Sequence, residues 1–222
     1  MSTGLVFRHY GREHSPDLRW QLLDVHAEVH AHGAGGGGTG GTSAGQAGGS
    51  GTGEPGAEDP FGAVERYART LDARMARPGW SCVIAYDGEE PVGYAHGAPL
   101  PAGDPWWRGL LSNVPAALAE EPGGRTYVLD ELVVRAAWRR FGTGRLLHDA
   151  LLDVRNEERA TLLVDQARPL MRALYESWGW TTLGEHRAWT PGAPLAHALL
   201  LPLPLAERAP TPDQAPAPTP AG

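Results

Sequence analysis

Hydrophobic and polar positions follow two different periods along this chain. Runs rich in β-branched and aromatic residues are typical of strands, and they occur at residues 5–10, 80–86, 91–98, 127–134, 160–165, 180–189 and 197–203. Apolar residues spaced three or four apart predict helices at residues 18–30, 61–75, 142–154 and 169–178. The pair Asp87-Gly88 between two of the strands predicts a hairpin turn.

Two of the predicted helices carry apolar faces that would pack on a sheet. The first has an apolar face at Leu146, Leu147, Ala150, Leu151 and Val154, with Arg145, His148, Asp149 and Asp153 on the other side. The second has its inner face at Leu170, Ala173, Leu174 and Trp178. The segment between residues 100 and 124 holds many prolines and acids, and we expect only short helices there, near 106–111 and 115–120.

Two low-complexity segments interrupt or end the pattern. Residues 33–60 are rich in glycine, and residues 204–222 are rich in proline, so neither can bury enough apolar surface to offset its ordering entropy. We expect a disordered glycine-rich insertion at 33–60 and a disordered tail at 204–222. Residues 1–32 are too few to fold alone, so they and residues 61–203 belong to one domain.

Composition and charge count against several classes of function. The net charge of −7 disfavours nucleic acid as a partner, because a general nucleic-acid binder carries a basic face. All 19 basic residues are arginine, which excludes chemistries that need a lysine, such as a Schiff base. Cys82 is the only cysteine and is expected to be a small buried hydrophobe. The sequence has no secretory signal and no span for a membrane, so we expect a cytoplasmic protein.

A strand, a short loop and a glycine-bearing helix start follow one another between residues 127 and 154. Gly142 and Gly144 leave the backbone accessible at the helix start, where unpaired N–H groups and the helix dipole favour an anion. Arg139, Arg140 and Arg145 add positive charge around this point. The alternative is that the glycines only make a tight turn between strand and helix.

Three stretches together resemble the GNAT family of N-acetyltransferases. Arg139-x-x-Gly142-x-Gly144 resembles that family's acyl-CoA pyrophosphate loop, and residues 131–134 (ELVV) resemble its central strand. About forty residues on, residues 173–180 (ALYESWGW) resemble its later signature. The resemblance implies a single domain of the α/β (α+β) class with a mixed, mostly antiparallel sheet, helices on both faces, and central strands that splay to admit the cofactor. It also implies acetyl-CoA as the co-substrate.

The resemblance also assigns roles to residues. Glu131 would be the base that deprotonates the amine, directly or through water, and Tyr175 the acid that protonates the CoA thiolate. Asp130 precedes Glu131, and because successive strand side chains point to opposite faces, only one of the two is expected to face the site. The residues expected to bind the cofactor are Leu132, Val133, Val134, Arg139, Arg140, Phe141, Gly142, Thr143, Gly144 and Arg145.

Several features leave alternatives open. Arg168 stands where the family often has an asparagine, so contacts to the pantetheine arm are undetermined. His26 and His30 lie one helical turn apart near Glu28 and His32, but no second cluster supports a metal site and we expect none. Glu28 is only a weak candidate contact to the acceptor. Trp106 and Trp107 would either pack on the sheet or cover a cationic or aromatic acceptor.

We therefore expect an enzyme that moves an acetyl group from acetyl-CoA to a primary amine, favouring a small-molecule amine. Acetylation of a protein N-terminus or lysine is the runner-up. A non-catalytic acyl-CoA sensor is the alternative from another class, and it would need neither Glu131 nor Tyr175. The sequence does not fix the oligomeric state, and a homodimer is allowed.

Overall fold

A computed structural model of the protein describes residues 4–31, 42–43, 60–187 and 194–205. Most of the expected glycine-rich insertion, residues 33–41 and 44–59, therefore lies outside the described residues. The same holds for residues 188–189 at the end of one predicted strand and for residues 206–222 of the expected disordered tail.

The elements follow the predicted order closely. Along the chain they are β1 (Val6–Gly11), η1 (Arg12–His14), α1 (Ser15–Ala31), β2 (Thr42–Ser43), α2 (Pro60–Met75), β3 (Ser81–Asp87), β4 (Glu90–Pro99), η3 (Pro105–Gly109), α3 (Ala116–Ala119), β5 (Thr126–Val134), η4 (Ala136–Trp138), α4 (Thr143–Asp153), β6 (Arg159–Asp165), α5 (Pro169–Ser177), β7 (Thr181–Arg187) and β8 (Leu195–Pro202). The hairpin predicted at Asp87-Gly88 joins β3 to β4, which pair antiparallel.

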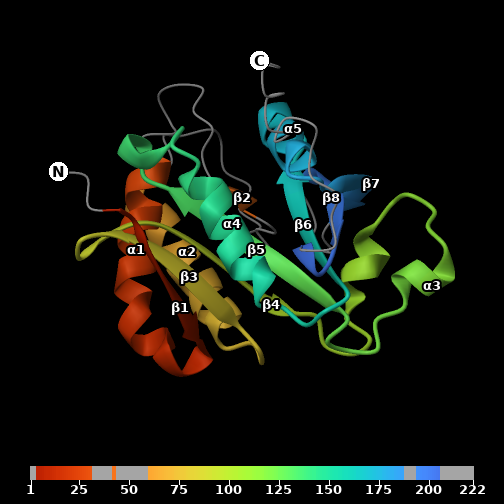
Figure 1. Ribbon diagram of the computed structural model, residues 1–222. Helices are drawn as coiled ribbons and strands as arrows, with labels where there is room; N and C mark the ends of the chain where they lie inside the picture. Colours follow the sequence, from red (N-terminus) through yellow and green to blue (C-terminus); the bar gives the residue numbers. More distant parts are fainter. Residues whose placement is uncertain (1–3, 32–41, 44–59, 188–193, 206–222) are drawn as a thin grey trace, which may run out of the picture.

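The strands form one mixed sheet. Its order is β1-β3-β4-β5-β6-β8-β7, with β2 paired to β5 off this path. Of these pairs only β5 and β6 run parallel, and the others are antiparallel. In Figure 1 the N-terminal strands and helices form one side of the molecule, and β6, β7, β8 and α5 form the other. The expected mixed, mostly antiparallel sheet is confirmed.

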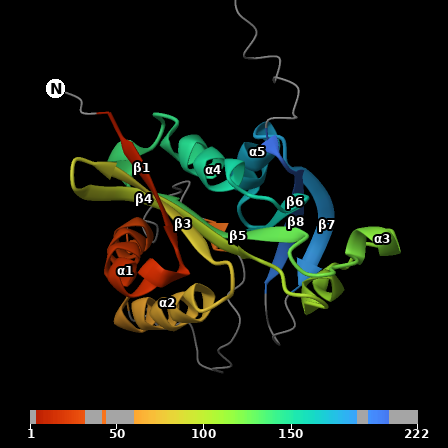
Figure 2. The same ribbon diagram turned by 60° about the horizontal axis from the view of Figure 1, so that its bottom comes forward.

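Helices cover both faces of this sheet. Figure 2 shows α1 and α2 on one face and α4 and α5 on the other. Leu22, Leu71 and Ile84 belong to the core between the sheet and α1 and α2. Leu147 and Leu151 belong to the core on the α4 face. Each strand in the middle of the sheet is therefore buried on both sides.

The apolar face predicted for α4 is partly wrong. Leu147 and Leu151 are buried, but Leu146 is 50% exposed and Val154 is 58% exposed. His148, expected on the polar side, is fully buried. The helix can turn His148 inward because its Nε2 accepts a hydrogen bond from the Trp180 Nε1 at 2.9 Å, so the buried imidazole keeps polar partners.

The inner face predicted for α5 is also partly wrong, since of its members Trp178 packs against the core. Leu170 is 69% exposed and Leu174 is 37% exposed, whereas Met171 and Tyr175 are buried. Tyr175 packs edge-to-face on Trp180, with ring centroids 5.9 Å apart. This large aromatic contact fixes the rotation of the helix, and the leucines are left on the outside.

Candidate active site

The central strands β5 and β6 separate along the part of β5 that holds Glu131, the predicted base. β5 and β6 pair only through residues 126–128 and 159–161, while β5 continues to Val134 and β6 to Asp165. The splay implied by the family resemblance is therefore present. Beyond residue 128, β5 no longer pairs with β6, and β2 pairs with β5 there instead. Thr42 lies opposite Leu132 and Ser43 opposite Glu131. A cofactor arm that pairs with the backbone of Leu132 would share this edge with β2.

A β-bulge in β5 sets which side chains face which helix layer. The register passes from Gly97 opposite Leu129 to His96 opposite Glu131, so Asp130 is an extra residue in β5. Asp130 binds Arg77, which follows α2, and Glu131 binds side chains of α1 and α2. The expectation that the two acids point to opposite faces is wrong, because the bulge interrupts the alternation.

Glu131 is a fully buried carboxylate surrounded by hydrogen-bond donors. Its Oε1 lies 2.9 Å from His26 Nδ1, and its Oε2 accepts hydrogen bonds from Tyr94, at 2.9 Å, and from Tyr67. His96 Nε2 lies 3.5 Å from the same Oε2. Burial alone would raise the pKa of Glu131, but the hydrogen bonds and charges of His26 and His96 outweigh it and hold this pKa well below its ordinary value.

The neighbouring rings fix the direction of these hydrogen bonds. Trp80 Nε1 can only donate, and it donates to His96 Nδ1 at 3.4 Å, so His96 carries its proton on Nε2. This nitrogen lies 3.5 Å from Glu131 Oε2 and has no hydrogen-bond partner among the described residues. An ionised Glu131 can only accept, so His26 carries a proton on Nδ1. Sequence reasoning missed Tyr67, Tyr94 and His96. A signal was present for two of them, because Tyr94 and His96 lie two apart in an otherwise apolar strand and so share one face.

Tyr175, the predicted acid, lies on the other side of β5. Its side chain is fully buried, with its ring centroid 5.2 Å from that of Trp178. It belongs to the same core as Leu132 and Val134, on the α4 face, whereas Glu131 faces α1 and α2. The structure therefore brings the predicted acid and base to opposite faces of the splayed part of β5.

The predicted phosphate loop has the geometry of an anion site. Gly142 caps α4 with a φ of 78°, and a side chain added there would meet no atom within 4 Å. Arg140 also has a positive φ, of 68°. Thr143, the first residue of α4, is 1% exposed, yet its Oγ1 has no hydrogen-bond partner among the described residues. A buried hydroxyl without a partner beside free helix N–H groups fits a phosphate oxygen.

The other residues predicted to bind the cofactor divide into two groups. Leu132, Val133 and Val134 bury their side chains, so they can offer only backbone groups. Two of the arginines are already engaged: Arg139 Nε donates to the Val134 carbonyl at 2.8 Å, and Arg145 Nε donates to Asp149 at 2.6 Å.

The remaining members of this set lie around the helix start. Phe141 is 79% exposed and Arg140 is also exposed, so both can contact a ligand from solvent. Gly144, in the first turn of α4, lies against Leu132 and Trp178, since an added Cβ would sit 3.6–3.7 Å from their side chains.

Other candidates from the sequence take structural roles. Trp107 is buried beside Leu100 and Val128, which confirms packing for this residue. Glu28 forms an ion pair with Arg135. Cys82 is fully buried, as expected, and burial raises the pKa of its thiol well above the ordinary value.

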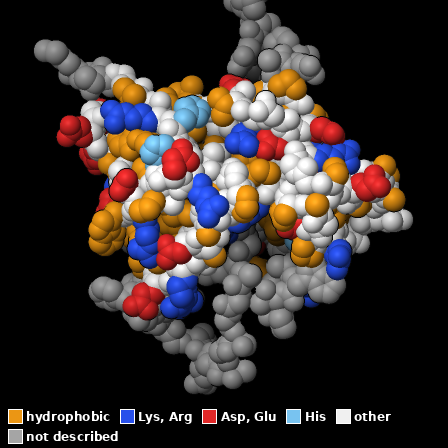
Figure 3. All heavy atoms as spheres, turned by 90° about the horizontal axis from the view of Figure 1, so that it is seen from below, with side chains coloured by type: hydrophobic (Ala, Val, Ile, Leu, Met, Phe, Trp, Pro, Cys, Tyr) orange, Lys and Arg blue, Asp and Glu red, His pale blue; other side chains and the backbone are white. Residues whose placement is uncertain are grey.

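The surface carries charges of both signs. Figure 3 shows arginine and acidic side chains interspersed over one face of the described part of the chain. None of the described helices has the length and the apolar character that crossing a membrane would need.

Comparison with known proteins identifies the family. The model of the acetyltransferase (GNAT) family matches residues 54–180, which is more than half of the chain. The chain therefore belongs to the GNAT family of acetyltransferases. By class it is an acetyl-CoA-dependent N-acetyltransferase with acetyl-CoA as its co-substrate. No curated protein matches the sequence significantly.

Solved structures share the fold at low sequence identity. An acetyltransferase from Thermus thermophilus superposes with a TM-score of 0.53 at 17% identity, over 91% of this chain and 99% of that one. Aminoglycoside 6'-acetyltransferase type Ii gives 0.53 at 17% identity, over 90% and 98%. NAA60 from Arabidopsis thaliana, in complex with acetyl-CoA, gives 0.54 at 12% identity, over 90% and 99%. These likenesses show the common fold.

Proposed function

We propose that this enzyme acetylates a small-molecule primary amine by direct attack within a ternary complex. The observation that carries the proposal is the buried Glu131 beside the splay, whose partners in the described chain are imidazoles and phenols. A buried carboxylate lined by aromatic rings suits an alkylammonium group of modest size. The net charge of −7 also favours a cationic acceptor.

The cofactor would be held at the start of α4. The backbone N–H groups after Gly142 and the Thr143 hydroxyl would bind the pyrophosphate, and the exposed Arg140 would add charge. The backbone of Val133 and Val134 would hold the thioester carbonyl. When bound, acetyl-CoA supplies the activated acetyl group.

Glu131 and His26 would together take the proton of the amine. An alkylammonium has a pKa of about 10 and must lose a proton before it can attack. Glu131 is fully buried while His26 is 8% exposed, so the imidazole would take the proton and the ionised Glu131 would stabilise the resulting positive charge. The neutral nitrogen then forms a bond to the thioester carbonyl carbon, and the bond from that carbon to sulfur breaks.

Tyr175 would complete the reaction as the acid. Its hydroxyl would give a proton to the departing CoA thiolate and regain one from solvent, while the proton held by Glu131 and His26 returns to water. Tyr175 shares a core with Leu132 and Val134, which border the splay. This position is what supports the assignment.

Acetyl-CoA turnover against a panel of amines tests the proposal. The panel holds polyamines, aminoglycosides, amino acids and N-terminal peptides, and release of free thiol is followed for the wild type, Glu131→Gln and Tyr175→Phe. We expect turnover with one class of small amine, and a loss of about 10²- to 10⁴-fold in kcat for Glu131→Gln. Turnover confined to the N-terminal peptides would move the acceptor to proteins.

Asp130→Asn is the matched control. Asp130 is the neighbouring buried carboxylate on the same face of β5, but its partner is Arg77 rather than His26. We expect this variant to lose stability while its kcat stays within about threefold of the wild type. Equal losses of kcat in Asp130→Asn and Glu131→Gln would contradict the role given to Glu131.

A further inference from the structure

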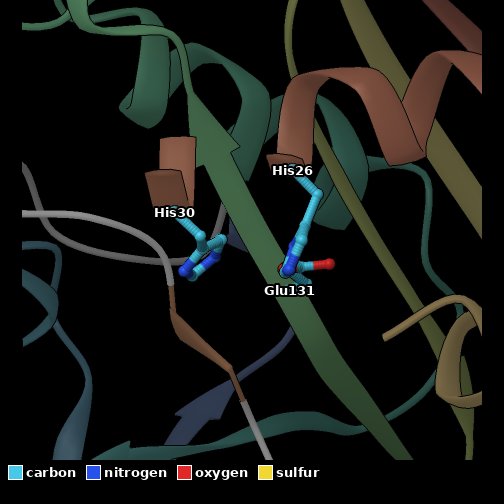
Figure 4. A group of neighbouring side chains, drawn as sticks. All are labelled: His26, His30 and Glu131. Carbon is cyan, nitrogen blue, oxygen red and sulfur yellow. The ribbon is translucent and has the colours of Figure 1, made fainter. Parts of the chain in front are cut away.

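We propose that His26, His30 and Glu131 form a binding site for a divalent transition metal of the zinc class. One ligand atom from each side chain lies within 4.8 Å of the other two. Figure 4 shows the two histidines projecting from α1 and Glu131 from β5 into the same space. The sequence brought together only two of the three ligands, His26 and His30, because Glu131 is 105 positions from His26.

The ligand set has the composition that zinc prefers. Two imidazole nitrogens and one carboxylate oxygen, with a fourth position open, are the protein ligands of one recurring class of zinc site. The histidines lie at positions i and i+4 on one helix, so both face β5. Their ring centroids are 4.0 Å apart. His32 lies outside the described residues, and Glu28 binds Arg135, so neither is included.

His30 provides an independent observation that points to a ligand. Its Nε2 is buried and has no hydrogen-bond partner within the described chain. An unpaired buried nitrogen is unfavourable, and a metal ion would satisfy it.

The surroundings hold these ligands in place. The Tyr67 ring stacks on His26 with centroids 3.3 Å apart, and Tyr94 donates a hydrogen bond to Glu131. Such contacts orient the ligands of metal sites.

Metal binding would have a consequence for the reaction. Coordination would replace the hydrogen bond between His26 and Glu131 and release the proton between them, so this pair could no longer accept a proton from the amine. Zinc would therefore inhibit acetyl transfer, and a chelator would reverse the inhibition. This consequence rests on the proposed function, but metal binding itself does not.

Titration of the untagged, EDTA-treated full chain with Zn²⁺ by calorimetry tests the site, with the visible absorption of bound Co²⁺ as a second readout. We expect one ion per chain and an affinity at least about tenfold weaker in His30→Ala. His14→Ala is the control, because His14 lies on η1 outside the cluster, and its affinity should equal that of the wild type. Circular dichroism checks folding, and His30→Gln replaces His30→Ala if the latter does not fold.

The outcomes separate the two proposals. Equal zinc affinity in wild type and His30→Ala, or no saturable binding, would overturn the metal site. Acetyl-CoA turnover is measured in EDTA, so an inactive chain that still binds zinc at this site would count against the proposed function alone.

Discussion

Replacing Thr143 by valine would separate cofactor binding from folding at the start of α4. The side chain is 1% exposed, and its hydroxyl has no hydrogen-bond partner among the described residues. Valine has nearly the same shape but no hydroxyl. The change therefore removes a buried polar group that folding leaves unpaired, and also a hydrogen bond that a phosphate oxygen would accept.

The two effects have opposite signs. A buried unpaired polar group costs about 1–3 kcal/mol, so Thr143→Val should keep or raise the unfolding free energy, by about 1 kcal/mol. That corresponds to about 2–4 °C in melting temperature for a chain of this size. A hydrogen bond to a charged phosphate contributes about 1.5–3 kcal/mol, so the Kd for acetyl-CoA should rise about 10- to 150-fold.

Thr161→Val is the matched control. Thr161 is also fully buried, but its Oγ1 donates to the Leu199 carbonyl at 2.8 Å, in the pairing of β6 with β8. This variant should lose about 1–3 kcal/mol of stability, because the carbonyl loses its donor, and should bind acetyl-CoA as the wild type does. Melting curves and calorimetric titration with acetyl-CoA measure both quantities. If Thr143→Val lost stability like the control and kept its affinity, the anion site would be wrong.

Three further predictions concern stability and reactivity. Cys82 is buried with a raised pKa, so a thiol reagent at pH 8 should label it only after denaturation; rapid labelling of the native chain would contradict this. Gly97→Ala should cost at least about 2 kcal/mol, since its Cβ would collide with a backbone carbonyl of β5, and a urea midpoint like that of the wild type would refute the tight register beside the bulge. Asp149 accepts hydrogen bonds from His148 and Arg145. Burial alone would raise the pKa of Asp149, but these two partners lower it. The ionised carboxylate therefore stabilises the fold above pH about 4, and this contribution is lost as pH falls further. Asp149→Asn should therefore be less stable than the wild type at pH 7, and the difference should shrink as pH falls below about 4. A difference that stays constant under acid conditions would contradict the ionised pair.

Much of the fold followed from local patterns. Strand and helix periods, the Asp87-Gly88 turn and the glycines of the phosphate loop act over a few residues, so the sequence alone indicated the elements and their order. The positive φ of Gly142 at the start of α4 is of this kind, because glycine adopts it without strain. The inner faces of α4 and α5 were not predictable in this way, since apolar residues lie on both sides of each helix and contacts such as that of Tyr175 with Trp180 select the rotation.

The candidate site also has some features that follow from neighbouring residues and others that depend on the tertiary structure. The sequence determined that an anion-binding helix start follows a strand with a carboxylate, Glu131, because these features are neighbours in the chain. Only the tertiary structure decided what surrounds that carboxylate. His26 and Tyr67 are 105 and 64 positions away, and the bulge at Asp130 turns Glu131 toward them. Contacts over such separations depend on how the helices dock on the sheet, and no local pattern encodes that.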